Sequence, residues 1–475
     1  MSDCCTPKNG GKHYDLAVIG AGSAGFSAAI AAAEQGAQVA LIGHGVIGGT
    51  CVNIGCVPSK TLIRAAETLH QASAAERFAG ISARAGADDW SALVHQKDEL
   101  VAGLRQSKYV DLLPAYNSIS YMEGQARLAE GGVALNGDLV KAERVIITTG
   151  ARPAIPSIPG IEAVDYLTST SALALETLPK SLLIIGGGFV GAELSQLFAR
   201  VGVKVTIVCR SQLLPSAEPE VAEALAKYMR NEGIRLNCGV TYKLVKATNG
   251  EVSLVVKAGS REEILAAERV LIATGRAPNV EGLGLKAAGI AQASNGSIEV
   301  DDRMRTTRPA VYAAGDVTGR DQFVYMAAYG AKLAAKNALN GDSLRYDHTA
   351  MPAVVFTDPQ VASVGLTEVA ARAVGHDVRT SVLPLSYLPR ALAARDTRGL
   401  IKLVANGRTR KLLGAHILAP EGGDSIQTAA LAIRQGLTID HLSDAIFPYL
   451  TTVEGLKLAA QAFDKEVSKL SCCAG

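Results

Sequence analysis

The pattern of hydrophobic and polar positions repeats once along the chain. Residues 15–43 combine an apolar strand, a glycine turn, an alanine-rich helix and a second apolar strand, DLAVIGAGSAGFSAAIAAAEQGAQVALIG. Residues 182–210 repeat that order with LLIIGGGFVGAELSQLFARVGVKVTIVCR. Each unit is followed by an apolar strand that ends in Thr-Gly, at residues 145–150 and 270–275. This order predicts an α/β fold with two nested doubly wound, Rossmann-type units.

The pattern changes after about residue 346. Alternating strands are predicted at residues 353–358 and 400–405, and a helix near residues 424–435. This order predicts an α+β third domain. The predicted parts are a disordered stub over 1–12, a first nucleotide-binding domain over 13–150 and 277–345, a second over 151–276, and the third domain over 346–475.

Composition narrows the class of protein. A chain of 475 residues exceeds what one core supports. Its 47 basic and 45 acidic residues give a net charge of +2, so no nucleic-acid or membrane partner is indicated. Eight cysteines are too sparse for a secreted disulfide scaffold. The start lacks an apolar leader, and no run approaches about 18 apolar residues. We expect a cytoplasmic protein.

Two glycine turns predict dinucleotide binding. In each, the first glycine makes a tight turn, the second admits a pyrophosphate to the backbone, and the third allows close packing of helix on strand. One such turn is weak evidence, but two, each between an apolar strand and a helix, are specific. The glycines are Gly20, Gly22 and Gly25 in the first turn and Gly186, Gly188 and Gly191 in the second.

The residue after the second strand of each unit helps to identify the cofactor. An acid there commonly binds ribose hydroxyls, but the corresponding residues are Gly43 and Cys209. Arg210 follows and can pair with a 2′-phosphate, which favours NADPH over NADH; the alternative is a solvated arginine in a turn. At Gly43 only water or backbone contacts remain for the ribose. A glutamate at this position is therefore expected to be tolerated or to tighten binding.

Four cysteines carry the candidate chemistry. Cys51 and Cys56 lie in GGTCVNIGCVPSK, where the start of a predicted helix favours a reactive thiolate. Cys472 and Cys473 are adjacent, so their α-carbons lie about 3.8 Å apart, closer than the roughly 4.4–6.8 Å of a relaxed disulfide. We expect two free thiols that bind a soft metal or exchange with the first pair. The alternative is a frayed tail with incidental cysteines.

Together, these sequence features resemble those of a known enzyme family. The glycine turns, CVNIGCVPSK and YAAGDVTG (residues 312–319) resemble the FAD-dependent pyridine nucleotide–disulfide oxidoreductases over nearly the whole chain. The tail cysteines and FPYLTTVEGLKLAAQ (residues 447–461) are similar to the members that reduce Hg²⁺. The resemblance implies FAD in the first domain, NADPH in the second, and a homodimer interface in the third.

The resemblance also implies residue roles. Cys51 becomes the interchange thiol, Cys56 the charge-transfer thiol against the flavin, and Asp316 a ligand near the ribityl chain. Lys60 and Glu193 are expected to form an ion pair beside the flavin N5, although a lone charge on such a helix is often only solvated. Further cofactor contacts are expected at Thr50, Gly150 and Gly275.

The chain departs from the family at two places. Gly43 replaces the usual glutamate, which puts the binding of the FAD ribose in question. We expect no N-terminal metal-binding module of the kind that many members carry, because only Cys4 and Cys5 occur in the predicted stub.

Tyr449 separates close relatives. Disulfide-reducing members carry a histidine there, five residues before a glutamate that corresponds to Glu454. An unperturbed tyrosine titrates near pH ~10 and is a poor proton shuttle at neutral pH, whereas Hg²⁺ reduction needs no proton on the metal. The alternative for Tyr449 is a packed interface aromatic. His441 is interpreted as a surface or cap residue and not as a substitute base.

The combined expectation is an FAD-dependent NADPH:Hg(II) oxidoreductase for mercury detoxification. Cys472 and Cys473, from the other subunit, are expected to take Hg²⁺ from thiol complexes and pass it to Cys51 and Cys56, with help from Tyr449. Two alternatives remain: a disulfide reductase like the large-type thioredoxin reductases, and a non-enzymatic flavin-containing metal-sequestering protein.

Overall fold

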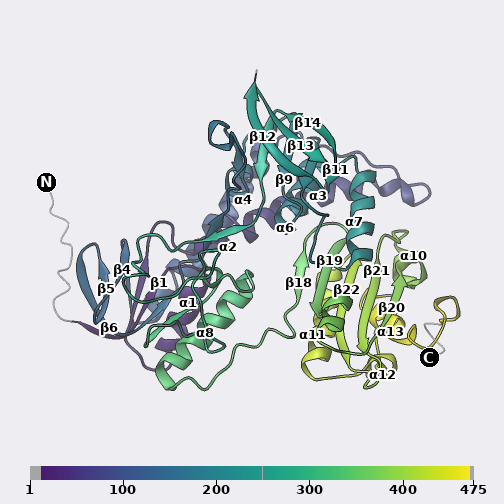
Figure 1. Ribbon diagram of the computed structural model, residues 1–475. Helices are drawn as coiled ribbons and strands as arrows, with labels where there is room; N and C mark the ends of the chain where they lie inside the picture. The colour runs from purple at the N-terminus through teal and green to yellow at the C-terminus, as the bar shows by residue number, and fades with distance from the viewer. Residues whose placement is uncertain (1–11, 249, 471–475) are drawn as a thin grey trace. The chain divides into compact units, whose positions relative to one another are not determined.

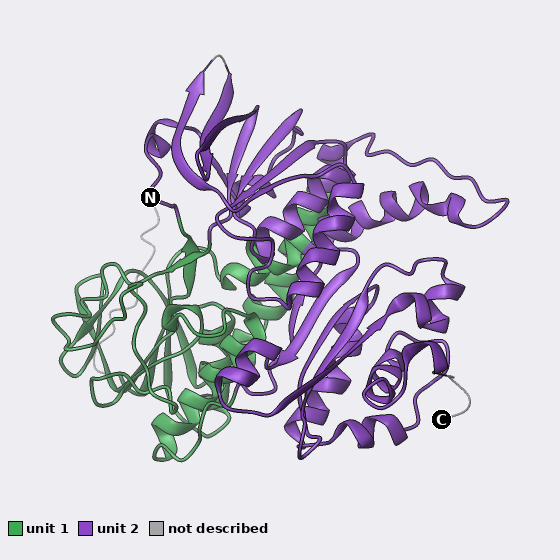
Figure 2. Cartoon of the chain, turned by 45° about the vertical axis from the view of Figure 1, so that its right-hand side comes forward, with its two compact units in different colours: residues 1–59, 94–154, 275–347 green, residues 60–93, 155–274, 348–475 purple. Residues whose placement is uncertain are grey.

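The computed structural model describes residues 12–248 and 250–470 and divides into two compact units (Figure 2). Unit 1 comprises residues 1–59, 94–154 and 275–347, and unit 2 comprises residues 60–93, 155–274 and 348–475. The predicted stub, apart from Lys12, and the pair Cys472 and Cys473 lie outside the described residues. The predicted domain limits remain a prediction.

Unit 1 is built on a seven-stranded sheet of order β3-β2-β1-β6-β5-β4, with β17 paired to β6 (Figure 1). The pairs β1–β2, β1–β6, β2–β3 and β6–β17 are parallel, as a doubly wound unit requires. The strands are β1 (His13–Ile19), β2 (Val39–Gly43), β3 (Ile119–Glu123), β4 (Ala126–Ala129), β5 (Gly132–Leu135), β6 (Asp138–Ile147) and β17 (Val311–Ala313).

Two alanine-rich helices, α1 (Ser23–Ala33) and α8 (Val324–Asn340), pack on one face of this sheet. Their small side chains let the helices approach each other and the strands closely, and Leu16, Val18 and Leu41 of β1 and β2 are fully buried beneath them. The helix α1 begins directly after the glycine turn that follows β1, as the sequence pattern predicts.

Unit 2 contains a second parallel sheet of order β11-β10-β9-β15-β8. The helix α6 (Phe189–Arg200) follows β9 after the second glycine turn, and α7 (Pro219–Asn231) links β10 to β11. The strands are β8 (Leu167–Thr168), β9 (Ser181–Ile185), β10 (Lys204–Cys209), β11 (Arg235–Cys238) and β15 (Arg269–Ile272); an antiparallel sheet of β12 (Thr241–Thr248), β13 (Glu251–Ala258) and β14 (Arg261–Ala267) shares their core.

The rest of unit 2 holds an antiparallel sheet of order β18-β19-β22-β21-β20. Its core includes residues of α11, α12 and α13. The elements are β18 (Ala353–Val355), β19 (Gln360–Gly365), β20 (Val378–Pro384), β21 (Leu400–Asn406), β22 (Leu412–Ala419), α11 (Gly422–Arg434), α12 (Ile439–Asp444) and α13 (Glu454–Gln461). The predicted fold class, two parallel α/β parts and a C-terminal α+β part, is confirmed.

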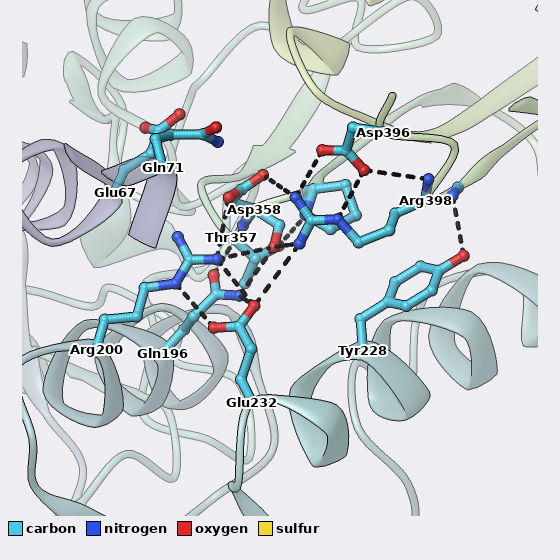
Figure 3. Close-up of polar contacts among 12 residues, drawn as sticks. Glu67, Gln71, Gln196, Arg200, Tyr228, Glu232, Thr357, Asp358, Asp396 and Arg398 are labelled. Atoms are coloured by element: carbon cyan, nitrogen blue, oxygen red, sulfur yellow. Dashed lines mark hydrogen bonds and ion pairs between the residues drawn. The ribbon is translucent and has the colours of Figure 1, made fainter. Parts of the chain in front are cut away.

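A network of buried charges joins the two main sheets of unit 2 (Figure 3). Arg200 of α6 pairs with Glu232 at 2.8 Å and with Asp358 at 3.0 Å. Arg398, just before β21, pairs with Asp358 at 3.2 Å and with Asp396 at 2.8 Å. Because each charge has a partner of opposite sign, the network fixes α6 to the segments that flank β18 and β21 without leaving an isolated buried charge.

Candidate functional site

The first glycine turn can only be made by glycine. Gly20 has φ +116°, and a Cβ added there would overlap the carbonyl of Thr148, which directly follows β6, the strand next to β1. A Cβ at Gly25 would overlap the carbonyl of Gly20. The Thr148 hydroxyl donates to the carbonyl oxygens of Ile19 and Gly20 at 3.0 Å. The turn therefore leaves its backbone open at the start of α1, which fits a dinucleotide pyrophosphate.

The predicted redox segment lies directly against this turn. The Gly48 amide donates to the Ala21 carbonyl at 2.9 Å, and Gly22 and Gly48 form a parallel bridge. Gly49 has φ +69°, and a Cβ there would lie only 2.6 Å from the Gly22 α-carbon. The short helix α2 (Gly49–Asn53), which carries Thr50 and Cys51, starts at this contact. Unit 1 thus brings the dithiol segment and the dinucleotide turn together.

The two redox cysteines stand on consecutive helices and are both partly exposed. Cys51 is in α2, and Cys56 is the first residue of α3 (Cys56–Ser73). Between them, the Asn53 side chain donates to the carbonyl oxygens of Ile47 and Gly49 at 2.9 Å. These bonds close the loop around Cys51. The predicted start of a helix within the cysteine motif is confirmed at Cys56.

Tyr109, which sequence reasoning missed, lies beside the dithiol. Its hydroxyl is 3.1 Å from the Ser23 hydroxyl, and its ring meets Phe26 edge-on at 4.9 Å. Burial raises the pKa of Tyr109, and nearby charge on Cys51 and Cys56 raises it further, against a hydrogen bond from Ser23. The phenol therefore stays protonated near the two sulfurs.

Tyr325 of α8 is a second missed phenol in unit 1. Burial is the main cause that raises the pKa of Tyr325, and the charges of Asp321 and Cys56 raise it further. In the sequence, Tyr325 falls within an ordinary amphipathic helix. Tyr109 falls in a five-residue π-helix (Gln106–Val110), which the spacing of apolar residues in the sequence does not predict. A π-helix is often found at functional sites, but it is visible only in the structure.

Asp316 lies at the start of a 3₁₀ turn, 3.5 Å from the Arg276 guanidinium. Burial raises the pKa of Asp316, and Arg276 opposes that shift. The Arg276 Nε is buried and has no hydrogen-bond partner among the described residues. Gly150 and Gly275 have φ of +71° and +111° at the ends of a two-stranded ribbon, β7 (Ala151–Pro153) and β16 (Arg276–Pro278). A half-buried acid that faces a buried guanidinium nitrogen fits a polar cofactor such as FAD.

The space beside Gly43 does not support the expectation that a glutamate is tolerated there. A Cβ on Gly43 would lie 2.5 Å from the Tyr121 hydroxyl and 2.9 Å from its ring carbon Cε2. Tyr121 of β3 therefore fills the place of the missing side chain. Gly43 is in register with Glu123, which shares a face of β3 with Tyr121 and is exposed. The acid absent from β2 is thus available one strand away.

The second glycine turn, in unit 2, repeats the first. Gly186 has φ +125°, and a Cβ at Gly191 would overlap the Gly186 carbonyl. A Cβ at Gly188 would meet no heavy atom within 4 Å, so its backbone is accessible to a phosphate. Arg210 is exposed and directly follows β10, where it can reach a 2′-phosphate. These residues fit NADPH.

The expected ion pair between Lys60 and Glu193 is present, with 2.7 Å between Nζ and Oε2. Glu193 is only 6 % exposed, and its second oxygen accepts the Phe356 amide at 2.9 Å. The Lys60 ammonium also lies 4.9 Å from the centre of the Phe356 ring. The alternative of two merely solvated charges is therefore wrong for Glu193. Lys60 stands one helical turn after Cys56 on α3.

Tyr449 is 54 % exposed, in the segment before α13. Glu454 is 3 % exposed and accepts the Leu450 amide at 3.2 Å; burial raises its pKa. His441 caps α12, since its Nδ1 accepts the Thr438 amide at 3.1 Å. The interpretation of His441 as a cap residue is confirmed, while the role of Tyr449 remains a prediction.

Comparison with protein families identifies the chain. Residues 14–335 match the pyridine nucleotide-disulphide oxidoreductases, and residues 351–460 match the dimerisation domain of the same proteins. The chain belongs to the pyridine nucleotide-disulphide oxidoreductase family.

Individual members of the family are similar to this chain over nearly all of its length. A mercuric reductase of Staphylococcus aureus is 47% identical over 97% of this chain and 84% of its own length. That of Streptomyces lividans is 47% identical over 97% of this chain and 98% of its own length. The HOCl-induced flavoprotein disulfide reductase RclA of Escherichia coli, solved as a Cu(II) complex, superimposes with a TM-score of 0.84 at 31% identity, over 95% of this chain and 99% of its own.

Proposed function

We propose that the chain reduces Hg²⁺ to Hg⁰ at Cys51 and Cys56 with electrons from NADPH, and that it serves in mercury detoxification. Mercuric reductase activity follows from the similarity to curated mercuric reductases over nearly the full chain. The single structural observation that supports the site is the direct contact between the redox segment and the first glycine turn. It supports a dithiol next to the turn that we assign to a dinucleotide.

FAD and NADPH are the cofactors of this activity. When bound, FAD would relay two electrons from NADPH first to the Cys51–Cys56 disulfide and then, from a second NADPH, to the Hg²⁺ held by the resulting dithiol. We assign FAD to the first turn, with Thr50, Gly150, Gly275 and Asp316 as further contacts. NADPH is assigned to the second turn, with Arg210 on its 2′-phosphate.

The residues of the chain supply ligands, protons and charge. Cys51 and Cys56 hold the substrate Hg²⁺, because two thiolates suit a soft ion. Tyr109 and Tyr325 stay protonated near them, since burial raises the pKa of each phenol. Lys60 pairs with Glu193 and stands one helical turn beyond Cys56 on α3.

The substrate arrives as a thiol complex in this proposal. The enzyme is a homodimer. Cys472 and Cys473 of the partner subunit take Hg²⁺ from the complex and pass it to the redox pair, so ligand exchange never releases a free ion. Tyr449 assists that transfer from its exposed position. We place this activity in the cytoplasm.

NADPH oxidation with excess thiol, with and without HgCl₂, tests the activity while volatile Hg⁰ is trapped. We expect Hg²⁺-dependent oxidation and one trapped Hg⁰ per NADPH. Oxidation that depends instead on a disulfide substrate, without Hg⁰, would identify a disulfide reductase. Tight Hg²⁺ binding without NADPH oxidation would identify a sequestering protein.

Mixed dimers test the shared site. One subunit carries Cys51→Ser and Cys56→Ser, and the other carries Cys472→Ala and Cys473→Ala. If tails act across the interface, a heterodimer has one intact composite site, so turnover with bulky thiol complexes rises on mixing. Flat activity despite confirmed heterodimers would contradict the shared site.

A further inference from the structure

Two cysteines outside the redox segment meet at the carboxyl end of the second parallel sheet, in unit 2. The strand β10 ends at Cys209 and β11 ends at Cys238, and the parallel register pairs these residues directly. Paired strands lie about 4.8 Å apart, and the two thiols hydrogen-bond to each other. The chain therefore contains a compact dithiol that the proposed reaction does not use.

The dithiol lies directly behind the second glycine turn. Cys209 is 4 % exposed, and a Cβ added to Gly187 would lie 3.0 Å from its Cβ and 3.1 Å from its sulfur. Gly187 stands between Gly186 and Gly188 in the turn, and its carbonyl accepts the Leu214 amide at 2.7 Å. The Cys209 sulfur thus lies beside the backbone assigned to the nucleotide.

The two thiols differ in reactivity. The pKa of Cys238 is lowered, mainly because the Cys209 thiol donates a hydrogen bond to it, with help from the charge of Arg230. The same hydrogen bond and burial raise the pKa of Cys209. Cys238 is also partly exposed, whereas Cys209 is buried. A soft ion therefore reaches the exposed side of the Cys238 sulfur first and the buried Cys209 sulfur second.

We propose that Cys209 and Cys238 form a second Hg²⁺ site, whose occupation obstructs the adenosine end of the NADPH site. Binding breaks two S–H bonds, forms two Hg–S bonds and releases two protons, and no electrons move. Cys209 stands where many dinucleotide folds place the ribose-binding acid, and Arg210 follows it. The obstruction, but not the metal binding, rests on the NADPH placement proposed above.

The test uses the full chain with every other cysteine replaced by serine. The six replaced residues are Cys4, Cys5, Cys51, Cys56, Cys472 and Cys473. Hg²⁺ retained after gel filtration in excess glutathione is measured, together with NADP⁺ affinity by calorimetry. The matched control adds Cys238→Ser, and Cys238→Ala serves as a second control. FAD content and circular dichroism establish that each variant is folded.

The two-cysteine chain should retain about one Hg²⁺ per molecule and then bind NADP⁺ at least about tenfold more weakly. Both effects should vanish in the Cys238 variants. By reciprocity, saturating NADP⁺ should weaken Hg²⁺ retention by the same factor. Equal retention with and without Cys238 would overturn the metal site, and retention without a change in NADP⁺ affinity would overturn the obstruction. Because these variants lack the catalytic thiols, neither result depends on turnover.

Discussion

Adding one carbon to Gly43 should disturb FAD binding. Gly43→Ala places a Cβ 2.5 Å from the Tyr121 hydroxyl and 2.9 Å from its ring, so Tyr121 has to move. Overpacking of this kind costs about 1–3 kcal/mol. If this cost falls on the FAD-bound form, the affinity for FAD drops roughly five- to 150-fold. Gly43→Glu adds the same overlap and places a carboxylate beside its register partner Glu123.

The assay is FAD titration of apoprotein by fluorescence, with thermal unfolding of the holoprotein. Tyr121→Val removes the overlapping ring and should restore binding to Gly43→Ala, with a favourable coupling of about 1–3 kcal/mol. Gly103→Ala is the matched control, because its Cβ meets no heavy atom within 4 Å in a helix. If Gly43→Ala bound FAD with the affinity of the wild-type protein and unfolded at the same temperature, the reasoning would be refuted.

Glu123 supplies a second arm of the same test. If its carboxylate replaces the ribose partner missing at Gly43, Glu123→Gln should weaken FAD binding by about 1.5–3 kcal/mol, the contribution of a hydrogen bond to a charged group. An unchanged affinity would show that Glu123 does not bind the ribose.

Three further predictions concern the nucleotide and the charges of unit 2. Arg210→Ala should raise KM for NADPH about ten- to a hundredfold and leave NADH little changed, since a charge-assisted contact contributes roughly 1.5–3 kcal/mol; equal losses in steady-state kinetics would contradict this. Lys402 is 2 % exposed and pairs with Glu218 at 3.0 Å, so Lys402→Met should lower the free energy of unfolding by about 3–5 kcal/mol in urea titrations, against about 0–1 kcal/mol for the exposed Lys469→Met. The pKa of His70 is lowered below its ordinary 6.5, mainly by burial and secondly by the charge of Arg200. As the pH falls, His70 is therefore protonated in the unfolded chain before it is protonated in the folded chain. The contribution of neutral His70 to the free energy of unfolding is fully present above pH 6.5 and is lost as pH falls through the pKa of the folded state. His70→Gln should flatten the decline of the unfolding midpoint between about pH 7 and pH 5, and an unchanged decline would contradict this.

Local patterns predicted the fold and the parts of the site that lie close together in sequence. The glycine turns follow from strand, turn and helix within a few residues, and Cys51 and Cys56 fall in one short segment beside the first turn. The ion pair of Lys60 and Glu193 spans 133 residues and was expected only through the family resemblance.

Contacts between distant strands and helices could not be predicted. Tyr109 meets Ser23 across 86 residues, from a π-helix that no apolar period indicates. Tyr121 fills the space at Gly43 because β3 pairs with β2, and that pairing depends on the whole sheet. The sequence indicates Cys209 only as a substitute for an acid, because the register of β10 and β11 is what brings Cys238 to it.

Replacement of the redox thiols tests the central claim most directly. Hg⁰ release is measured in closed vessels with NADPH and excess thiol for Cys51→Ser and Cys56→Ser, each with its FAD content determined. Both cysteines are partly exposed and serve chemistry more than packing, so each variant should retain FAD and release no Hg⁰ above a protein-free blank. Wild-type release of Hg⁰ by either FAD-loaded variant would contradict the assignment of Hg²⁺ reduction to this dithiol.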